Sequence, residues 1–248
     1  MSDGIVRLRT HGLVKVFAGR MQRRTVFQLV RARATGRAFE RKGYRSLDGI
    51  DIEARPSEVV GIVGTNGAGK TTLLKTIAGL YAPTAGRIDI VGEVALFAGL
   101  GAGMVDELSV ADNIYLYGAI CRLRRRTIRE RFEHILAWSE LEQFVDAELR
   151  TLSTGMRTRL AFAIAMHVDS EVVLMDEAFS AGDKQFQEKC DQFFRDTKKL
   201  PRTLLVATHN LGFVREFCDR TLWLHQGRQM AFGPTAEILP RYEALAVS

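Results

Sequence analysis

Apolar runs rich in β-branched residues recur along the chain and alternate with segments that have helical spacing of apolar positions. The runs predict buried strands at 59–63, 171–177 and 204–207. Helices are predicted after two of them, at 72–78 and 184–200. This alternation of strand and helix is typical of an α/β protein with a parallel sheet.

Weaker patterns predict the remaining elements. Residues 107–149 are mostly helical by pattern, which indicates a helical subdomain, and a strongly apolar helix is predicted at 160–166. Further strands are predicted at 5–17, 47–54, 87–91 and 93–98, a hairpin within 221–232, and a last helix that opens at Pro234 and Thr235.

The strand at 59–63 is followed by a glycine-rich turn and then by a helix. The turn fits the pattern G-x-x-x-x-G-K-[ST], and a chance match would lack these flanking elements. Glycines let backbone N–H groups surround phosphate oxygens, and the helix N-terminus adds positive potential. The sequence therefore predicts a nucleoside triphosphate site, in which Lys70 reaches the β- and γ-phosphates and Thr71 holds Mg²⁺. The expected phosphate-binding residues are Gly64, Thr65, Asn66, Gly67, Ala68, Gly69, Lys70, Thr71 and Thr72.

Two further strand ends carry side chains suited to phosphate chemistry. Asp176 and Glu177 end the strand at 171–177, and adjacent strand residues point to opposite faces. Asp176 can hold Mg²⁺ through water, whereas Glu177 can polarise a water for attack on the γ-phosphate. A lone histidine is usually structural, but His209 follows a parallel strand, where it is well placed for the γ-phosphate.

Charge is distributed unevenly along the chain. The net charge is +6, but residues 1–45 carry +10 and the remainder carries −4. Such a basic segment suggests an anionic partner, which could be nucleic acid, phospholipid or a pyrophosphate-linked substrate. Residues 20–45 predict an imperfect basic amphipathic helix, which can lie at a membrane interface; a solvated helix is the alternative.

Composition narrows the class of protein. The chain is 46% hydrophobic and 26% charged, which is typical of a globular domain. Its three cysteines are far apart and form no C-x-x-C pair, so packed, reduced thiols in a cytosolic protein are expected. We see no signal peptide and no run of 18 apolar residues, so a membrane role would need a partner.

These motifs resemble the nucleotide-binding subunit of an ABC transporter from about Gly12 to Gly233. Residues 152–156, Leu-Ser-Thr-Gly-Met, resemble the signature motif Leu-Ser-Gly-Gly-Gln, and residues 180–183 resemble the D-loop. The resemblance implies Asp176 as the Mg²⁺ ligand, Glu177 as the catalytic base and His209 as the switch histidine. It also implies one P-loop NTPase domain over 1–248, with a RecA-like core, an antiparallel β subdomain and a helical subdomain at about 105–150.

The resemblance further implies a dimer that binds two ATP molecules head to tail. Ser153 and the backbone of Gly155 would contact the γ-phosphate of ATP held by Lys70 of the other copy. An aromatic side chain stacks on adenine in this family. We expect Phe17 in that role, with Tyr44 as the alternative.

Departures from the family pattern point to a subfamily. No glutamine stands between Gln28 and Gln143, and residues 99–104, Gly-Leu-Gly-Ala-Gly-Met, occupy the place of the usual Q-loop. Together with the basic insertion, this resembles the ATPases that export O-antigen, capsule or teichoic-acid chains. The resemblance implies a membrane permease and a lipid-linked polysaccharide as partners, at the cytoplasmic face of the membrane.

Two other functions are weighed against this one. An ATPase of a lipid or drug exporter would be expected to have the Q-loop glutamine and no basic insertion. A soluble ABC ATPase acting on nucleic acid would need a long coiled coil or two cassettes in one chain. The sequence therefore favours the polysaccharide exporter and no nucleic-acid partner.

Overall fold

A single mixed sheet forms the centre of the computed structural model, which describes residues 6–18, 43–176 and 184–246. Ten described strands are ordered β3-β1-β2-β10-β9-β4-β8-β7-β6, and β5 pairs with β1. Their bounds are β1 (Leu8–Phe17), β2 (Tyr44–Ile50), β3 (Glu53–Ala54), β4 (Val59–Val63), β5 (Ala85–Ile90), β6 (Val94–Ala98), β7 (Val172–Asp176), β8 (Thr203–Ala207), β9 (Arg220–His225) and β10 (Arg228–Pro234).

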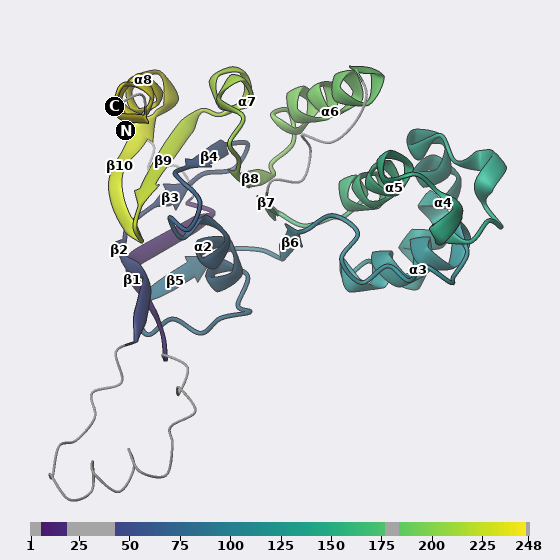
Figure 1. Ribbon diagram of the computed structural model, residues 1–248, viewed down its shortest axis with the longest axis horizontal. Helices are drawn as coiled ribbons and strands as arrows, with labels where there is room; N and C mark the ends of the chain where they lie inside the picture. Colours follow the sequence, from purple (N-terminus) through teal and green to yellow (C-terminus); the bar gives the residue numbers. More distant parts are fainter. Residues whose placement is uncertain (1–5, 19–42, 177–183, 247–248) are drawn as a thin grey trace, which may run out of the picture.

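Helices cover both faces of this sheet, and three of them extend to one side as a separate lobe (Figure 1). The lobe contains α3 (Val110–Ile120), α4 (Arg125–Ser139) and α5 (Thr154–Met166), with the short 3-10 helices η1 (Glu142–Phe144) and η2 (Leu149–Thr151). The other helices are α2 (Lys70–Ile77), α6 (Lys184–Thr197), α7 (Leu211–Phe217) and α8 (Thr235–Ala246). None of the helices in the described ranges has the length and hydropathy needed to span a bilayer.

The parallel part of the sheet sets the position of the loops that follow its strands. β4 lies between β8 and β9, and β7 lies between β8 and β6, all in parallel pairs. Every residue of β4 and β8 is buried, as their unbroken apolar sequences predict. Because the carboxyl ends of parallel strands share one edge, Val63, Asp176 and Ala207 lie at the same edge of the sheet.

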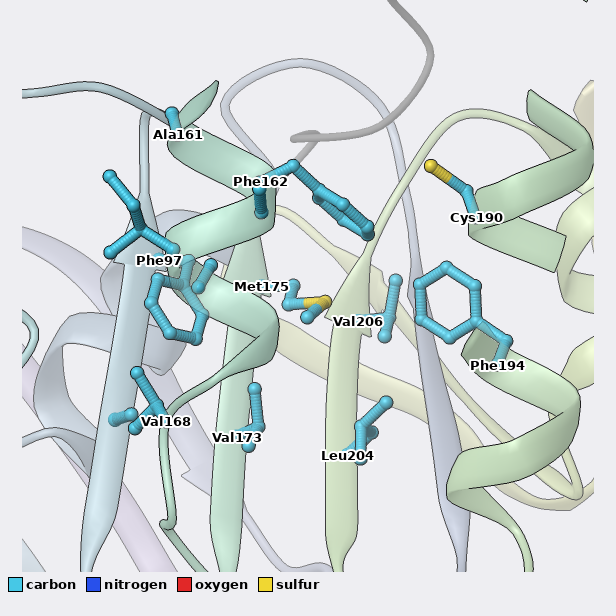
Figure 2. Close-up of a cluster of buried hydrophobic side chains, with 14 of the residues drawn as sticks. Phe97, Ala161, Phe162, Val168, Val173, Met175, Cys190, Phe194, Leu204 and Val206 are labelled. Carbon is cyan, nitrogen blue, oxygen red and sulfur yellow. The ribbon is translucent and has the colours of Figure 1, made fainter. Parts of the chain in front are cut away.

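Alternate residues of the central strands pack into two separate cores. Val60 and Ile62 of β4 belong to the core that contains Leu73 and Leu74 of α2. Val59 and Val63 of the same strand belong to the opposite core. Figure 2 shows this second core, where Phe162 of α5 and Phe194 of α6 face strand residues that include Met175 and Val206.

The predicted α/β fold is confirmed, with differences at particular elements. The strand predicted at 47–54 is two strands, β2 and β3, and Gly49 has a positive φ of 71° shortly before the break. The helix α7 has no counterpart in the prediction because it is short and contains Gly212. Its start is fixed by Asn210, whose side chain accepts a hydrogen bond from the Phe213 N–H at 3.0 Å.

The predicted basic helix at 20–45 lies mostly outside the described residues. Its last two residues, Tyr44 and Arg45, form the beginning of β2.

Candidate nucleotide-binding site

The glycine-rich loop between β4 and α2 has the backbone that its sequence predicts. Gly67 and Gly69 have φ values of 78° and 106°, in the region that favours glycine, and α2 begins directly afterwards at Lys70. A Cβ atom on Gly69 would lie 2.7 Å from the carbonyl oxygen of Ser46. A side chain there would therefore push the loop away from β2.

This loop forms the floor of a pocket of about 490 Å³. That volume is within the range of small-molecule binding sites in proteins. Most of the predicted phosphate-binding residues line it, together with residues of β2 and β7 and the glycine that follows β6. The lining residues are Tyr44, Ser46, Asn66, Gly67, Ala68, Gly69, Lys70, Thr71, Thr72, Gly99 and Asp176.

Lys70 connects the loop to the end of the neighbouring strand. Its side chain is buried, and Nζ donates to the carbonyl oxygens of Gly64 at 2.8 Å and Thr65 at 3.4 Å. Nζ also lies 3.1 Å from Nε2 of His209, an exposed residue beyond β8. A phosphate that reached the ammonium group would therefore also lie near the imidazole.

Two oxygen-bearing side chains in the pocket suit a divalent cation. Thr71 is exposed at the start of α2, and Asp176 is the last residue of β7. Both line the pocket, and hydroxyl and carboxylate oxygens are ligands that Mg²⁺ prefers. These residues fit the predicted metal site. Glu177 lies outside the described residues, so its role as catalytic base stays a prediction.

The two aromatic candidates for adenine stacking occupy different surroundings. Phe17 and Tyr44 are paired across β1 and β2. Tyr44 is 59% exposed and lines the pocket, whereas the Phe17 ring packs edge-on against Tyr81 with centroids 5.2 Å apart. Phe17 is not among the residues that line this pocket. The geometry favours Tyr44, the alternative of the sequence interpretation, and the stacking itself stays a prediction.

Comparison with known proteins decides the family. The model of the family described as "ABC transporter" matches residues 47–180, more than half of the chain. The chain belongs to the ABC transporter family. The resemblance inferred from the P-loop and signature motifs is thereby confirmed.

Curated members of this family are similar over most of the chain. The O-antigen export system ATP-binding protein of Myxococcus xanthus is 39% identical over 82% of this chain and 47% of its own length. The teichoic acids export ATP-binding protein of Lactococcus lactis is 37% identical over 82% of this chain and 43% of its own. The chain thus spans about half the length of these two relatives. An O-antigen export system ATP-binding protein of Klebsiella pneumoniae is 36% identical over 81% of both chains.

Solved structures of ABC proteins share the fold. An ATP-binding subunit of an ABC transporter superposes with a TM-score of 0.74 at 21% identity, covering 96% of this chain and 93% of its own. A dimeric ATP-binding cassette bound to ADP and Pi gives 0.72 at 20% identity, covering 92% of this chain and 98% of its own. This likeness confirms the predicted fold class.

The segment predicted to be the signature motif, residues 152–156, does not line this pocket. Ser153 is exposed and caps α5, since its Oγ accepts a hydrogen bond from the Met156 N–H at 3.2 Å. Neither Ser153 nor Gly155 lines the pocket. Figure 1 shows why, because α5 belongs to the side lobe whereas α2 lies against the sheet.

The sequence interpretation missed two residues that line the pocket, Ser46 and Gly99. Ser46 lies just before the strand predicted at 47–54, so the sequence interpretation gave no reason to place it at the pocket. Gly99 directly follows Ala98, which pairs with Asp176 across β6 and β7. The glycine-rich loop at 99–104 therefore begins at the predicted metal site.

Proposed function

We propose that this protein is the ATP-hydrolysing subunit of an exporter that moves a lipid-linked polysaccharide across the cytoplasmic membrane. A partner permease would supply the path, with this subunit bound at the cytoplasmic face. The observation that carries the substrate class is the similarity to relatives named for O-antigen and teichoic-acid export. Three of them are 36–39% identical and match about four-fifths of this chain.

The geometry of the pocket supports ATP as the energy source. Lys70 would exchange its contacts with loop carbonyls for phosphate oxygens, and the loop amides would surround the same phosphates. Thr71 and Asp176 would hold Mg²⁺, which balances phosphate charge when it is bound. Glu177 would accept a proton from the attacking water, and His209 would lie at the γ-phosphate end of the site.

The position of the signature segment supports a dimer of two such subunits. Ser153 and Gly155 are placed away from the chain's own pocket, so they are available to a nucleotide held by a second copy. Each ATP would then lie between the Lys70 of one copy and the Ser153 of the other. Binding would close the dimer and hydrolysis would reopen it, and this movement would drive the permease.

Deletion of the gene tests the substrate class directly. Cells without the protein should still make the polysaccharide but retain it on the cytoplasmic side, attached to its lipid carrier. Immunodetection of surface and intracellular polysaccharide separates these pools, and complementation with the wild type or with Lys70→Ala provides the controls. Normal surface polysaccharide in a deletion strain with no redundant exporter would refute the substrate and leave the ATPase proposal standing.

A further inference from the structure

Ser46 makes a side-chain contact with the phosphate-binding loop from another part of the sheet. It lies on β2, is 4% exposed, and its Oγ donates a hydrogen bond to Oγ1 of Thr72 at 2.9 Å. Thr72 belongs to the first turn of α2, and both residues line the pocket. A buried hydroxyl on a distant strand is thus held against a hydroxyl of the predicted phosphate site.

The backbone around Ser46 fixes this contact. The carbonyl oxygen of Ser46 is so close to the loop and to the β9–β10 turn that a Cβ atom on Gly69 or Gly227 would lie within 2.7 Å of it. The Gly227 N–H donates to the Ala68 carbonyl at 2.9 Å, and the Asp48 N–H donates to the Gly227 carbonyl at 2.8 Å. β2 and the turn therefore brace the phosphate-binding loop from behind, and Ser46 cannot shift independently of it.

We infer that Ser46 is a positioning residue for nucleotide phosphates and acts through Thr72. The Ser46 hydroxyl uses its hydrogen atom in the bond to Thr72. The Thr72 hydroxyl therefore keeps its own hydrogen atom and can donate it to another group. With Oγ1 of Thr72 fixed by Ser46, that hydrogen is directed into the pocket towards a phosphate oxygen. Without Ser46, the Thr72 hydroxyl rotates among several orientations and donates in only some of them.

Strand β2 would then contribute residues at both the adenine end and the phosphate end of the nucleotide. Tyr44 and Ser46 of β2 both line the pocket, with Tyr44 the candidate for adenine and Ser46 acting on the phosphates through Thr72. This inference rests on the proposed nucleotide binding. It adds a residue of β2 to the phosphate site.

Steady-state hydrolysis of MgATP by the purified full chain tests the inference. Ser46→Ala should raise KM about fivefold with kcat nearly unchanged, as expected for loss of one hydrogen bond that acts on binding alone. Ser46→Cys preserves the volume but has a weakly bonding thiol, so the same rise is expected. Ser139→Ala is the matched control, because Ser139 is also buried and hydrogen-bonded, to the Leu136 carbonyl in the side lobe.

A double-mutant cycle separates action through Thr72 from a general loss of packing. Thr72→Ala should raise KM, Thr72→Ser should stay close to wild type, and Ser46→Ala should add nothing to Thr72→Ala. Additive effects, or an unchanged KM in both Ser46 variants, would overturn the inference.

A comparison of ligands with and without adenine shows which end of the nucleotide Ser46 acts on. Ser46→Ala should weaken MgATP, MgADP and magnesium tripolyphosphate by the same factor. A loss confined to the two adenine ligands would assign Ser46 to the Tyr44 end and overturn the phosphate role. A wild-type protein that binds none of the three would instead refute the proposed nucleotide site itself.

Discussion

Nζ of Lys70 lies 3.1 Å from Nε2 of His209. Because an ammonium group has no lone pair, Lys70 is the donor when this contact is a hydrogen bond, and Nε2 is then the acceptor. Lys70 begins α2 after β4, and His209 follows β8, which pairs with β4 in parallel. Two adjacent strand ends therefore bring the cation and the imidazole to the same place, where a γ-phosphate would be bound.

Lys70→Ala should lose nucleotide affinity. Removing a charged hydrogen-bond donor from a phosphate costs about 1.5–3 kcal/mol, so the Kd for MgATP should rise by at least about tenfold. Titration with a fluorescent ATP analogue measures this. Lys75→Ala is the control, because Lys75 lies on the same helix but its Nζ faces Tyr81, 5.9 Å from the ring centroid. Wild-type affinity in Lys70→Ala would contradict the P-loop assignment.

Glu177→Gln should bind ATP but nearly stop turnover, because an amide cannot accept a proton from the attacking water. The same variant should accumulate an ATP-bound dimer, visible by size-exclusion chromatography with and without MgATP. Near-normal hydrolysis by the purified variant would remove Glu177 from the role of base.

Ser153→Arg should be inactive although its own pocket is intact. In a mixed dimer with Lys70→Ala, both lesions fall in one composite site and leave the other intact. A one-to-one mixture should therefore recover about a quarter of wild-type hydrolysis if dimers form at random. Lys70→Ala mixed with a chain that carries both changes is the control, since no intact site can form. Recovery of no activity at any ratio would count against action across the dimer.

The three buried cysteines should make the protein less stable at high pH. Burial raises the pKa of the Cys121, Cys190 and Cys218 thiols from 9.0 to about 12. Between these values the unfolded chain releases protons that the folded chain retains. The free energy of unfolding should therefore fall as pH rises from about 9 towards 12.

Urea unfolding at pH 8 and pH 10 measures this effect. Each thiol should contribute a fall of about 1.4 kcal/mol over this interval. A variant with alanine at all three positions should be less stable at pH 8, because it has lost buried side chains, but should show a smaller fall by pH 10. An equal fall in both proteins would show that other groups cause it.

The sequence predicted best what depends on local chemistry. The G-x-x-x-x-G-K-[ST] spacing forces one backbone path, so the loop from Gly64 to α2 could be predicted together with most of the residues that line the pocket. The position of Asp176 at the pocket could be predicted because an apolar strand that ends in a carboxylate is unusual, and its role as a Mg²⁺ ligand stays a prediction.

Contacts between distant segments could not be predicted in the same way. Nothing near Ser46 indicates that β2 pairs with β10 and thereby meets the P-loop, since this depends on strand order. The choice between Phe17 and Tyr44 has the same origin. The two residues pair across β1 and β2, and they differ because Tyr44 lines the pocket whereas Phe17 packs on Tyr81.

The basic segment 20–45 should matter for export more than for ATP hydrolysis. Arg20, Arg23, Arg24 and Arg31 of this segment belong to none of the nucleotide motifs. Arginines near a membrane attract anionic headgroups or a carrier pyrophosphate by about 1 kcal/mol each. Changing Arg20, Arg23, Arg24 and Arg31 to Gln should therefore lower surface polysaccharide strongly while the ATPase activity of the purified protein changes little.

A second quadruple variant tests whether export depends on the position of the lost arginines or only on the loss of four positive charges. Arg122, Arg124, Arg125 and Arg129 are exposed arginines at the α3–α4 turn and the first turns of α4. Changing these four to Gln alters the net charge by the same amount at a different place, and export should then fall less. Immunodetection of surface polysaccharide in both strains, at matched protein levels, compares them. If both variants lower export equally, or if hydrolysis falls in parallel with export in the first, the segment has no specific role at the membrane.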